Sequence, residues 1–525
     1  MFRSCPRIPI ALGALLSGLL ALAQQNDIPL NRDIYYDIDR NGAEKSSTMH
    51  TGMRPIIASR ADLTNVMGFR PDSTPQYYWI TEKLFQKHLI NVAEGGFRLT
   101  IDPVFQFEVG KEYREDSEYS NSHTMNHNGR GFYLAADLGS TVSFQSSFYE
   151  NQAVLPGYLY TFSQNQSVVP GQGRIKRFNS RGLDFAWVTG DVSWSPRPWI
   201  NAQIGQGRHF VGNGYRSMLL SDNASPYPFV KLSALTTNKH FQYTAIFAKL
   251  QMVGEENRLP TGEAGESLFY WKRATFLHLS VNLGPMQLGC FEGTMWNNID
   301  TSGVRPFNTM QLNPVIGLNT VVNGFDGKNT QLLGLDVKYK LTDKVFAYAQ
   351  YALTDPKRNR YGWQLGMQWF DLFRRDMHLL AEFNQATPGA YTRTDERMSW
   401  IHDNQPLASP RGTGFSEVVL RLDYSLVKKI WLQGELSWEQ HRSGTNAGPG
   451  TADVFGTYAP IRSVPSDQQS IYAGFNASWR MNQMSNMQLT LGWTMRDLQP
   501  APTANTSGYV YISFHTGLFN RYYDI

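Results

Sequence analysis

Apolar and polar side chains alternate with a period of two along much of the chain after residue 96. Between residues 97 and 109 every odd-numbered position is apolar, whereas most even-numbered positions are polar or charged. The same alternation returns at residues 333–341, 418–424 and 471–479. Because successive side chains of a strand point to opposite faces, this period predicts strands with one apolar and one polar face.

Further strand candidates fill the intervals between these segments. They bring the total to about 18, each near the roughly 9–11 residues that a tilted strand needs to cross a bilayer. They lie at residues 131–138, 142–150, 184–194, 199–206, 229–235, 241–251, 274–283, 286–296, 344–353, 361–369, 377–385, 430–439, 487–496 and 508–518.

Tight turns and long connections alternate between the expected strands. The turns include residues 139–141, 196–198, 236–239, 284–285, 342–343 and 426–429, and the long connections include residues 110–130, 151–183, 207–228, 252–273, 297–330, 386–414 and 440–468. A meander with short turns at one rim and long loops at the other is typical of outer-membrane barrels.

We therefore predict an all-β fold, a closed antiparallel transmembrane β-barrel of about 18 strands, because only closure satisfies every backbone amide in lipid. A soluble β-sandwich is the alternative, and the loop asymmetry argues against it. The end of the chain departs from the barrel pattern. Outer-membrane strands often finish on an aromatic residue, but here the apolar residues at 510, 512, 514 and 519 are followed by residues 520–525, which leaves the register of the last strand open.

The residues before the barrel follow other patterns. Arg3 and Arg7 precede an apolar run that ends at Ala23, which predicts a cleaved signal peptide over residues 1–23 and export to the outer membrane of a Gram-negative cell. Residues 79–88 have a helical period. We expect residues 24–95 to form a small, partly helical periplasmic segment that caps or plugs the barrel, and residues 96–525 to form the barrel with long extracellular loops.

Composition and motifs limit the kinds of ligand and reaction that the sequence supports. The net charge of +4 has no basic block typical of nucleic-acid binding, and Cys290 is the only cysteine outside the leader. Asp37, Asp39 and Asn41 resemble half a calcium loop, but Thr48 stands where a bidentate carboxylate is needed, so we expect a polar turn. No motif indicates an enzyme, a metal site or a cofactor, and outer-membrane lipid is the first expected partner.

The most distinctive sequence motifs in the chain lie between residues 205 and 228. Two pairs of glycines flank an Arg-His-Phe-Val run and precede a Ser-Met-Leu-Leu-Ser run and an Asn-Ala-Ser-Pro turn. In order, the named positions are Gly205, Gly207, Arg208, His209, Gly212, Gly214, Tyr215, Arg216, Asn223, Pro226 and Pro228. This stretch resembles the signature of the capsule-assembly Wzi family, including its gliding-motility branch, the RemB-like outer-membrane proteins.

The resemblance implies a barrel of 18 strands that binds exopolysaccharide and so assembles or retains a capsule, or that supports gliding motility with an adhesin or motility partner. The glycines and prolines would shape a loop that folds back toward the pore. We expect polysaccharide contacts from residues of this loop and from two tryptophans: Arg208, His209, Tyr215, Arg216, Asn223, Trp296 and Trp400.

Each candidate has a structural alternative. Arg208 and Arg216 would instead neutralise acids of the barrel wall such as Asp102 or Glu435, and Trp296 would belong to an interfacial aromatic girdle. Tyr160 is a further aromatic candidate on an outer loop. The alternative function is a porin-like channel for small solutes, because wide barrels often hold an aqueous pore.

Overall fold

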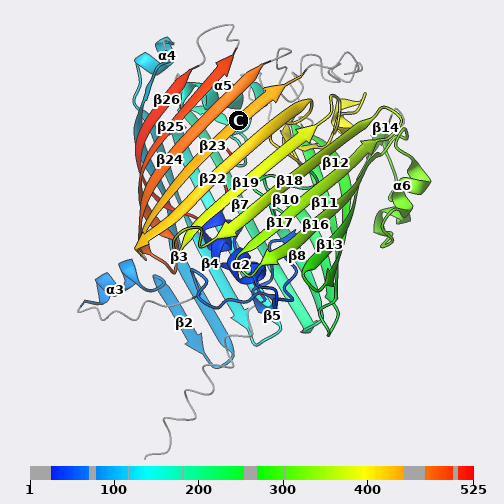
Figure 1. Ribbon diagram of the computed structural model, residues 1–525, viewed down its shortest axis with the longest axis horizontal. Coiled ribbons are helices and arrows are strands. Elements are labelled where there is room, and N and C mark those ends of the chain that lie inside the picture. Colours follow the sequence, from blue (N-terminus) through cyan, green and yellow to red (C-terminus); the bar gives the residue numbers. More distant parts are fainter. Residues whose placement is uncertain are drawn as a thin grey trace, which may run out of the picture.

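Eighteen antiparallel strands close into a barrel (Figure 1). The computed structural model describes residues 25–69, 78–115, 117–178, 182–253, 269–300, 303–427, 429–442, 468–499 and 506–525. The predicted fold class is confirmed, and each predicted strand overlaps a strand of the wall. The predicted signal peptide lies outside the described residues.

The wall is a meander in which the first strand pairs with the last. Its strands are β3 (Phe97–Tyr113), β4 (Met125–Leu138), β5 (Val142–Val154), β7 (Gly182–Arg197), β8 (Ile200–Gly207), β10 (Tyr227–Leu235), β11 (Phe241–Val253), β12 (Phe269–Leu283), β13 (Met286–Trp296), β16 (Thr330–Thr342), β17 (Val345–Asp355), β18 (Arg360–Phe370), β19 (Met377–Ala386), β22 (Phe415–Val427), β23 (Ile430–His441), β24 (Gln469–Asn482), β25 (Met487–Gln499) and β26 (Ser507–Thr516).

Over most of the wall the two faces follow the predicted alternation, with apolar side chains outside and polar ones inside, whereas Phe276 and Phe291 face the lumen in an apolar cluster around Trp400. On β16, Leu335 is 53% exposed on the outer face, whereas Asp336 and Lys338 are 2% and 1% exposed in the lumen. Where the alternation holds, this reverses the arrangement of a soluble protein, because the interior there is a polar lumen into which other segments of the chain fold. The outer face requires an apolar surrounding such as lipid.

Short turns gather at one end of the barrel, which we call the short-turn rim. Gly284 lies in the turn between β12 and β13 with φ of 63°, a value that favours glycine. The opposite end, the long-loop rim, carries the long connections together with α4 (Glu118–Asn121) and α5 (Gly157–Gln166). The connection from β17 to β18 is the short exception at that rim.

Smaller elements supplement the wall. The helices are α2 (Arg32–Ala43), η1 (Ala58–Arg60), α3 (Trp79–Phe85), η4 (Thr309–Leu312), α6 (Leu318–Asn323) and η5 (Glu396–Met398), and the short strands are β1 (Met53–Arg54), β2 (Ile90–Glu94), β6 (Lys176–Phe178), β9 (Phe210–Val211), β14 (Ile299–Asp300), β15 (Gly303–Val304), β20 (Ile401–His402) and β21 (Gln405–Pro406). Across the described part of the chain, no helix combines the length and apolar character needed to cross a membrane.

The residues before the barrel divide into two parts. Residues 25–69, including α2, lie within the barrel toward the short-turn rim, and α3 projects outside it with β2 (Figure 1). Asn31 caps α2 by accepting a hydrogen bond from the amide of Asp33, and the helix buries Ile34 and Ile38. The polar turn expected at residues 37–42 is wrong, because the capped helix and its apolar face continue through these residues.

Candidate functional site

The distinctive glycine-rich stretch crosses the lumen. It leaves the wall at the end of β8 and returns at β10, and we call residues 208–226 the crossing loop. Val211 of β9 pairs with Met53 of β1, and the amide of Gly212 donates to the carbonyl of Gly52 at 2.8 Å. The crossing loop is therefore joined to the N-terminal segment inside the barrel.

Two of the predicted loop glycines meet clear geometric requirements. Gly212 has φ of 127°, which side chains rarely adopt. A Cβ at Gly214 would lie 2.3 Å from Oε2 of Glu382 on β19. The other predicted shape residues border the loop, since Gly205 and Gly207 belong to β8, Pro226 precedes β10 and Pro228 lies in β10.

Arg216 forms the centre of a buried ionic cluster. Its guanidinium is 0% exposed and lies 2.7 Å from Oε1 of Glu417 and 2.6 Å from Oδ2 of Asp524. Arg411 shares the same Glu417 oxygen at 2.8 Å and pairs with Glu439 at 2.6 Å. Two arginines and three carboxylates thus join the crossing loop, a second loop over residues 387–414, strands β22 and β23, and the end of the chain. We call these five residues the lumen ion cluster.

A second carboxylate holds the backbone of the crossing loop. Oε2 of Glu382 accepts from the amide of Tyr215 at 2.7 Å, and Oε1 accepts from the amide of Arg216 at 3.0 Å. The hydroxyl of Tyr348 donates to the same Glu382 side chain at 2.7 Å. The close approach of this carboxylate explains why residue 214 is glycine.

Residues 517–525 turn into the lumen after β26 instead of extending the wall. The amide of Arg32 donates to Oδ1 of Asn520 at 2.9 Å, and the Arg32 guanidinium lies over the rings of Tyr215 and Tyr522 at 4.0 and 4.5 Å. This resolves the open register of the last strand, which ends at Thr516. The polar residues beyond it are lumen contacts, so the apolar pattern of a wall strand does not continue through them.

The lumen ion cluster makes stability sensitive to acid. Burial alone would raise the pKa of the Asp524 carboxyl, but Arg216 and Arg411 outweigh it and lower that pKa to about 2. A depressed carboxyl pKa contributes stability that is complete above the ordinary value of 3.8 and is lost as pH falls toward 2. We expect the melting temperature of the barrel in detergent to fall over this pH range, and to fall less in an Asp524→Asn variant. Equal acid sensitivity in both proteins would contradict the assignment.

Arg208, His209 and Asn223 are buried among protein groups. The Arg208 guanidinium donates to the carbonyl of Gly171 and lies 4.8 Å from the ring of Trp187. Burial lowers the pKa of Arg208 to about 10 and the pKa of His209 well below its usual value. The side-chain Nδ2 of Asn223 donates to the carbonyl of Pro406 at 3.3 Å. Their polar contacts support the crossing loop, and direct contact with sugar stays a prediction.

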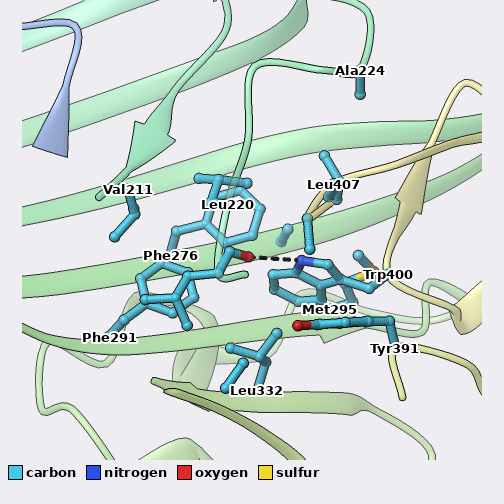
Figure 2. Packing of buried hydrophobic residues seen from close by; sticks show 14 of the residues in the cluster. Val211, Leu220, Ala224, Phe276, Phe291, Met295, Leu332, Tyr391, Trp400 and Leu407 are labelled. Carbon is cyan, nitrogen blue, oxygen red and sulfur yellow. Dashed lines mark hydrogen bonds between the residues drawn. The ribbon is translucent and has the colours of Figure 1, made fainter. Parts of the chain in front are cut away.

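The two candidate tryptophans lie on opposite sides of the wall. Trp400 packs within the lumen, 1% exposed, and donates to the carbonyl of Leu219 at 3.0 Å (Figure 2). Trp296 is 2% exposed on the outer side of β13 and donates to Oγ1 of Thr275 at 3.0 Å. Neither ring is open to solvent. Tyr160 of α5 stacks on Tyr119 with ring centroids 4.5 Å apart.

The structure brings Tyr215 and Arg216 together with acids that sequence reasoning missed. Arg216 pairs with Glu417 and Asp524, whereas the wall acids proposed for it were Asp102 and Glu435. Glu435 does face the loop, because it accepts from the hydroxyl of Tyr215 at 2.7 Å. Glu417 and Glu439 occupy polar positions of two strands, which is a signal that they face the lumen. Nothing in the sequence indicates which acid meets which arginine.

A cavity of about 210 Å³ lies between the crossing loop, the wall and residues 521–524. Tyrosines and carboxylates dominate its lining: Tyr158, Tyr215, Tyr472, Tyr509, Tyr511, Tyr523, Asp33, Glu108, Glu435 and Asp524. Ring faces beside hydrogen-bonding groups are the combination that sugar rings and their hydroxyls require. Among the described residues, no group of three or more His, Cys, Asp or Glu side chains is arranged to hold a metal ion.

Comparisons with known proteins concern the fold. No protein-family model matches the chain, and no curated protein matches it. The Wzi structure of Escherichia coli, an outer-membrane protein involved in group 1 capsule assembly and a carbohydrate-binding β-barrel, matches with a TM-score of 0.54 at 13% identity. The match covers 93% of this chain and 99% of Wzi.

Weaker matches include OccAB2 of Acinetobacter baumannii, with a TM-score of 0.43 and 11% identity over 80% of this chain and 99% of that one. OpdO of Pseudomonas aeruginosa matches with a TM-score of 0.45 and 8% identity over 80% of this chain and 96% of that one. The match to Wzi shows that the chain has the fold of an outer-membrane β-barrel.

Proposed function

We propose that this protein spans the outer membrane and holds surface polysaccharide, as a capsule or slime layer, on the cell. The observation that carries the proposal is the filled lumen, in which the N-terminal segment, the crossing loop and residues 517–525 contact one another. A filled barrel favours an anchor over a porin, the alternative weighed from the sequence. The fold likeness to a carbohydrate-binding barrel supports the same choice.

In this proposal the short-turn rim faces the periplasm, since the segment that would follow the signal peptide enters the barrel at that end. The long-loop rim then faces the medium and meets the polysaccharide. A role in gliding motility, which the resemblance to RemB-like proteins implies, is part of the same proposal. A polysaccharide layer would also form the contact between the cell and the solid surface on which it moves.

The chemistry of the long-loop rim suggests acidic sugars as the ligand class. Lys357 and Arg358 are exposed in the turn between β17 and β18, and both pair with Asp326. Arg360 lies in the same turn region, and Arg393 donates to the carbonyls of Phe325 and Gly327. Arg358 also pairs with Asp355 at 2.6 Å, so these four cations are matched by the two carboxylates of residues 326 and 355. Arginine pairs with carboxylates through charge-assisted hydrogen bonds, which suits uronic or other acidic sugars.

Deletion of the gene tests the proposal. We expect less surface-bound and more released polysaccharide in the culture, together with altered spreading on agar. Complementation with the wild-type chain should restore both. A Lys357→Ala/Arg358→Ala variant should restore retention less well, whereas Lys344→Ala, an exposed lysine of the short-turn rim, should restore it fully. Unchanged retention and spreading after deletion would contradict the function.

The candidate Arg208 is tested in the same complemented cells. Arg208→Ala removes the bond to Gly171 and the contact with Trp187, and is expected to weaken retention by loosening the base of the crossing loop. Heat modifiability on a gel should show that the variant still forms a barrel. A folded variant with normal retention would remove Arg208 from the site.

A further inference from the structure

Several polar side chains on the outer face of the wall are hidden. Phe276, Phe291 and Leu332 face the lumen in the apolar cluster around Trp400, so their neighbours along each strand face outward. Those neighbours include Thr275 on β12, Glu292 on β13 and Gln331 on β16. Each is 0–1% exposed although it faces away from the lumen. Something outside the barrel must therefore cover them.

The cover is part of the long connection between β13 and β16, which we call the outer strap and define as residues 304–323. The amide and Oγ1 of Thr320, in α6, donate to Oε1 of Glu292 at 2.8 and 2.7 Å. Oγ1 of Thr275 donates to the carbonyl of Gln311, in η4, at 2.8 Å. Figure 1 shows α6 outside the barrel, beside the wall. The strap thus satisfies polar groups that the wall turns outward.

The outer strap reaches well down the wall. The hydroxyl of Tyr243 donates to the carbonyl of Pro314 at 2.5 Å. Tyr243 is the third residue of β11, which begins at the short-turn rim. A loop that belongs to the long-loop rim therefore extends along most of the height that the strands span, and so lies beside the apolar band of the wall.

The face that the strap turns away from the wall is apolar. Its exposed large side chains include Val321 at 81% and Val304 at 71% exposure, together with Phe307, Leu312, Val315 and Val322. The only ionisable side chain between residues 304 and 323 is Arg305. The neighbouring outward residues of the wall, such as Leu335, are apolar and exposed as well. The strap therefore continues the apolar outer surface of the barrel.

We propose that the outer strap is embedded in the membrane, where its apolar face contacts lipid acyl chains and its polar face shields Glu292, Thr275 and Gln331 from them. Bare polar and charged side chains on the lipid side of a barrel are destabilising, and the strap removes that exposure. An amphipathic segment with one satisfied polar face and one apolar face suits this position. The inference rests on the proposal that the barrel spans a membrane.

Site-directed labelling tests the inference. Cys5 and Cys290 are replaced by serine, and single cysteines are introduced as Val321→Cys on the strap, Leu335→Cys on the wall and Lys357→Cys on the long-loop rim. Each variant is labelled with bimane and reconstituted into phosphatidylcholine vesicles with and without doxyl-labelled phosphatidylcholine. We expect the doxyl lipid to reduce emission about twofold or more at residues 321 and 335, as for groups among acyl chains, and to leave residue 357 unchanged.

The outcomes separate this inference from the proposed function. Quenching at residue 335 without quenching at residue 321 would overturn the embedded strap and leave the membrane barrel intact. Absence of quenching at residue 335 would overturn both. Protection of residue 321 from doxyl lipid and from aqueous iodide, with cross-linking between copies through that cysteine, would instead identify the strap as an interface between two barrels and would also overturn the inference.

Discussion

Replacing Arg216 with alanine is expected to destabilise the folded barrel by about 3–5 kcal/mol, the range for removing one partner of a buried ion pair. The substitution leaves Glu417 and Asp524 buried and close together, with Arg411 as the remaining cation. The crossing loop would also lose one of its links to the end of the chain, while Asp222 keeps its bonds to the side chains of residues 520 and 522. The measurement is the temperature at which the compact, heat-modifiable form disappears on a gel after heating in detergent.

The matched control is Lys357→Ala. Lys357, in the exposed turn between β17 and β18, pairs with Asp326 at 2.7 Å, and both side chains are largely exposed. Exposed pairs of this kind contribute little to stability, so the control should melt close to the wild type. Equal melting temperatures for Arg216→Ala and the control would show that the lumen ion cluster does not stabilise the barrel.

The wild-type protein is expected to give no steady open-channel current in planar bilayers, and deletion of residues 25–67 is expected to produce such currents. An empty barrel of this size would hold an aqueous pore, as barrels of 16–18 strands do. Here the deleted segment contributes the β1 partner of the crossing loop and the Arg32 contacts to Tyr215 and Tyr522. Without it, the cavity of about 880 Å³ between this segment and the wall at the short-turn rim would widen into a continuous aqueous space.

Heat modifiability must first show that the shortened chain still folds. A Lys344→Ala variant of the full chain serves as the control, because it changes an exposed lysine at the same rim and leaves the lumen contacts in place. Steady, large currents from the wild type would favour the porin function instead of the anchor.

The wall of the barrel is predictable from sequence because its signal is local. The alternation at residues 333–341 places Leu335 outside and Asp336 inside, as the structure has them. The contents of the lumen are not predictable in this way. Glu417 and Arg216 are 201 positions apart, and only the closed barrel brings them together. The alternation places acids and arginines of several strands in a shared interior, but it does not assign partners.

Two departures from the alternation of apolar and polar residues indicate structural features that the sequence analysis did not predict. The polar residues after β26 interrupt the alternation of a wall strand because Asn520, Tyr522 and Asp524 bind lumen groups. Glu292 lies at an outward position of β13, where lipid would disfavour a bare carboxylate. Such an acid on the lipid face is a sequence signal that another segment covers the wall at that point. A partly helical segment is expected over residues 24–95, but the polar turn expected at residues 37–42 is wrong because α2 continues through them.

The barrel closes where β3, the first strand of the wall, pairs with β26, the last strand. We call this pairing the seam. The segments on either side of that seam, residues 25–69 and 517–525, both enter the interior and touch at Arg32 and Asn520. Pairing of the first and last strands and entry of these two segments into the lumen are thus coupled steps of biogenesis. The machinery that inserts this protein must therefore allow the barrel to close while the N-terminal and C-terminal segments are already inside it.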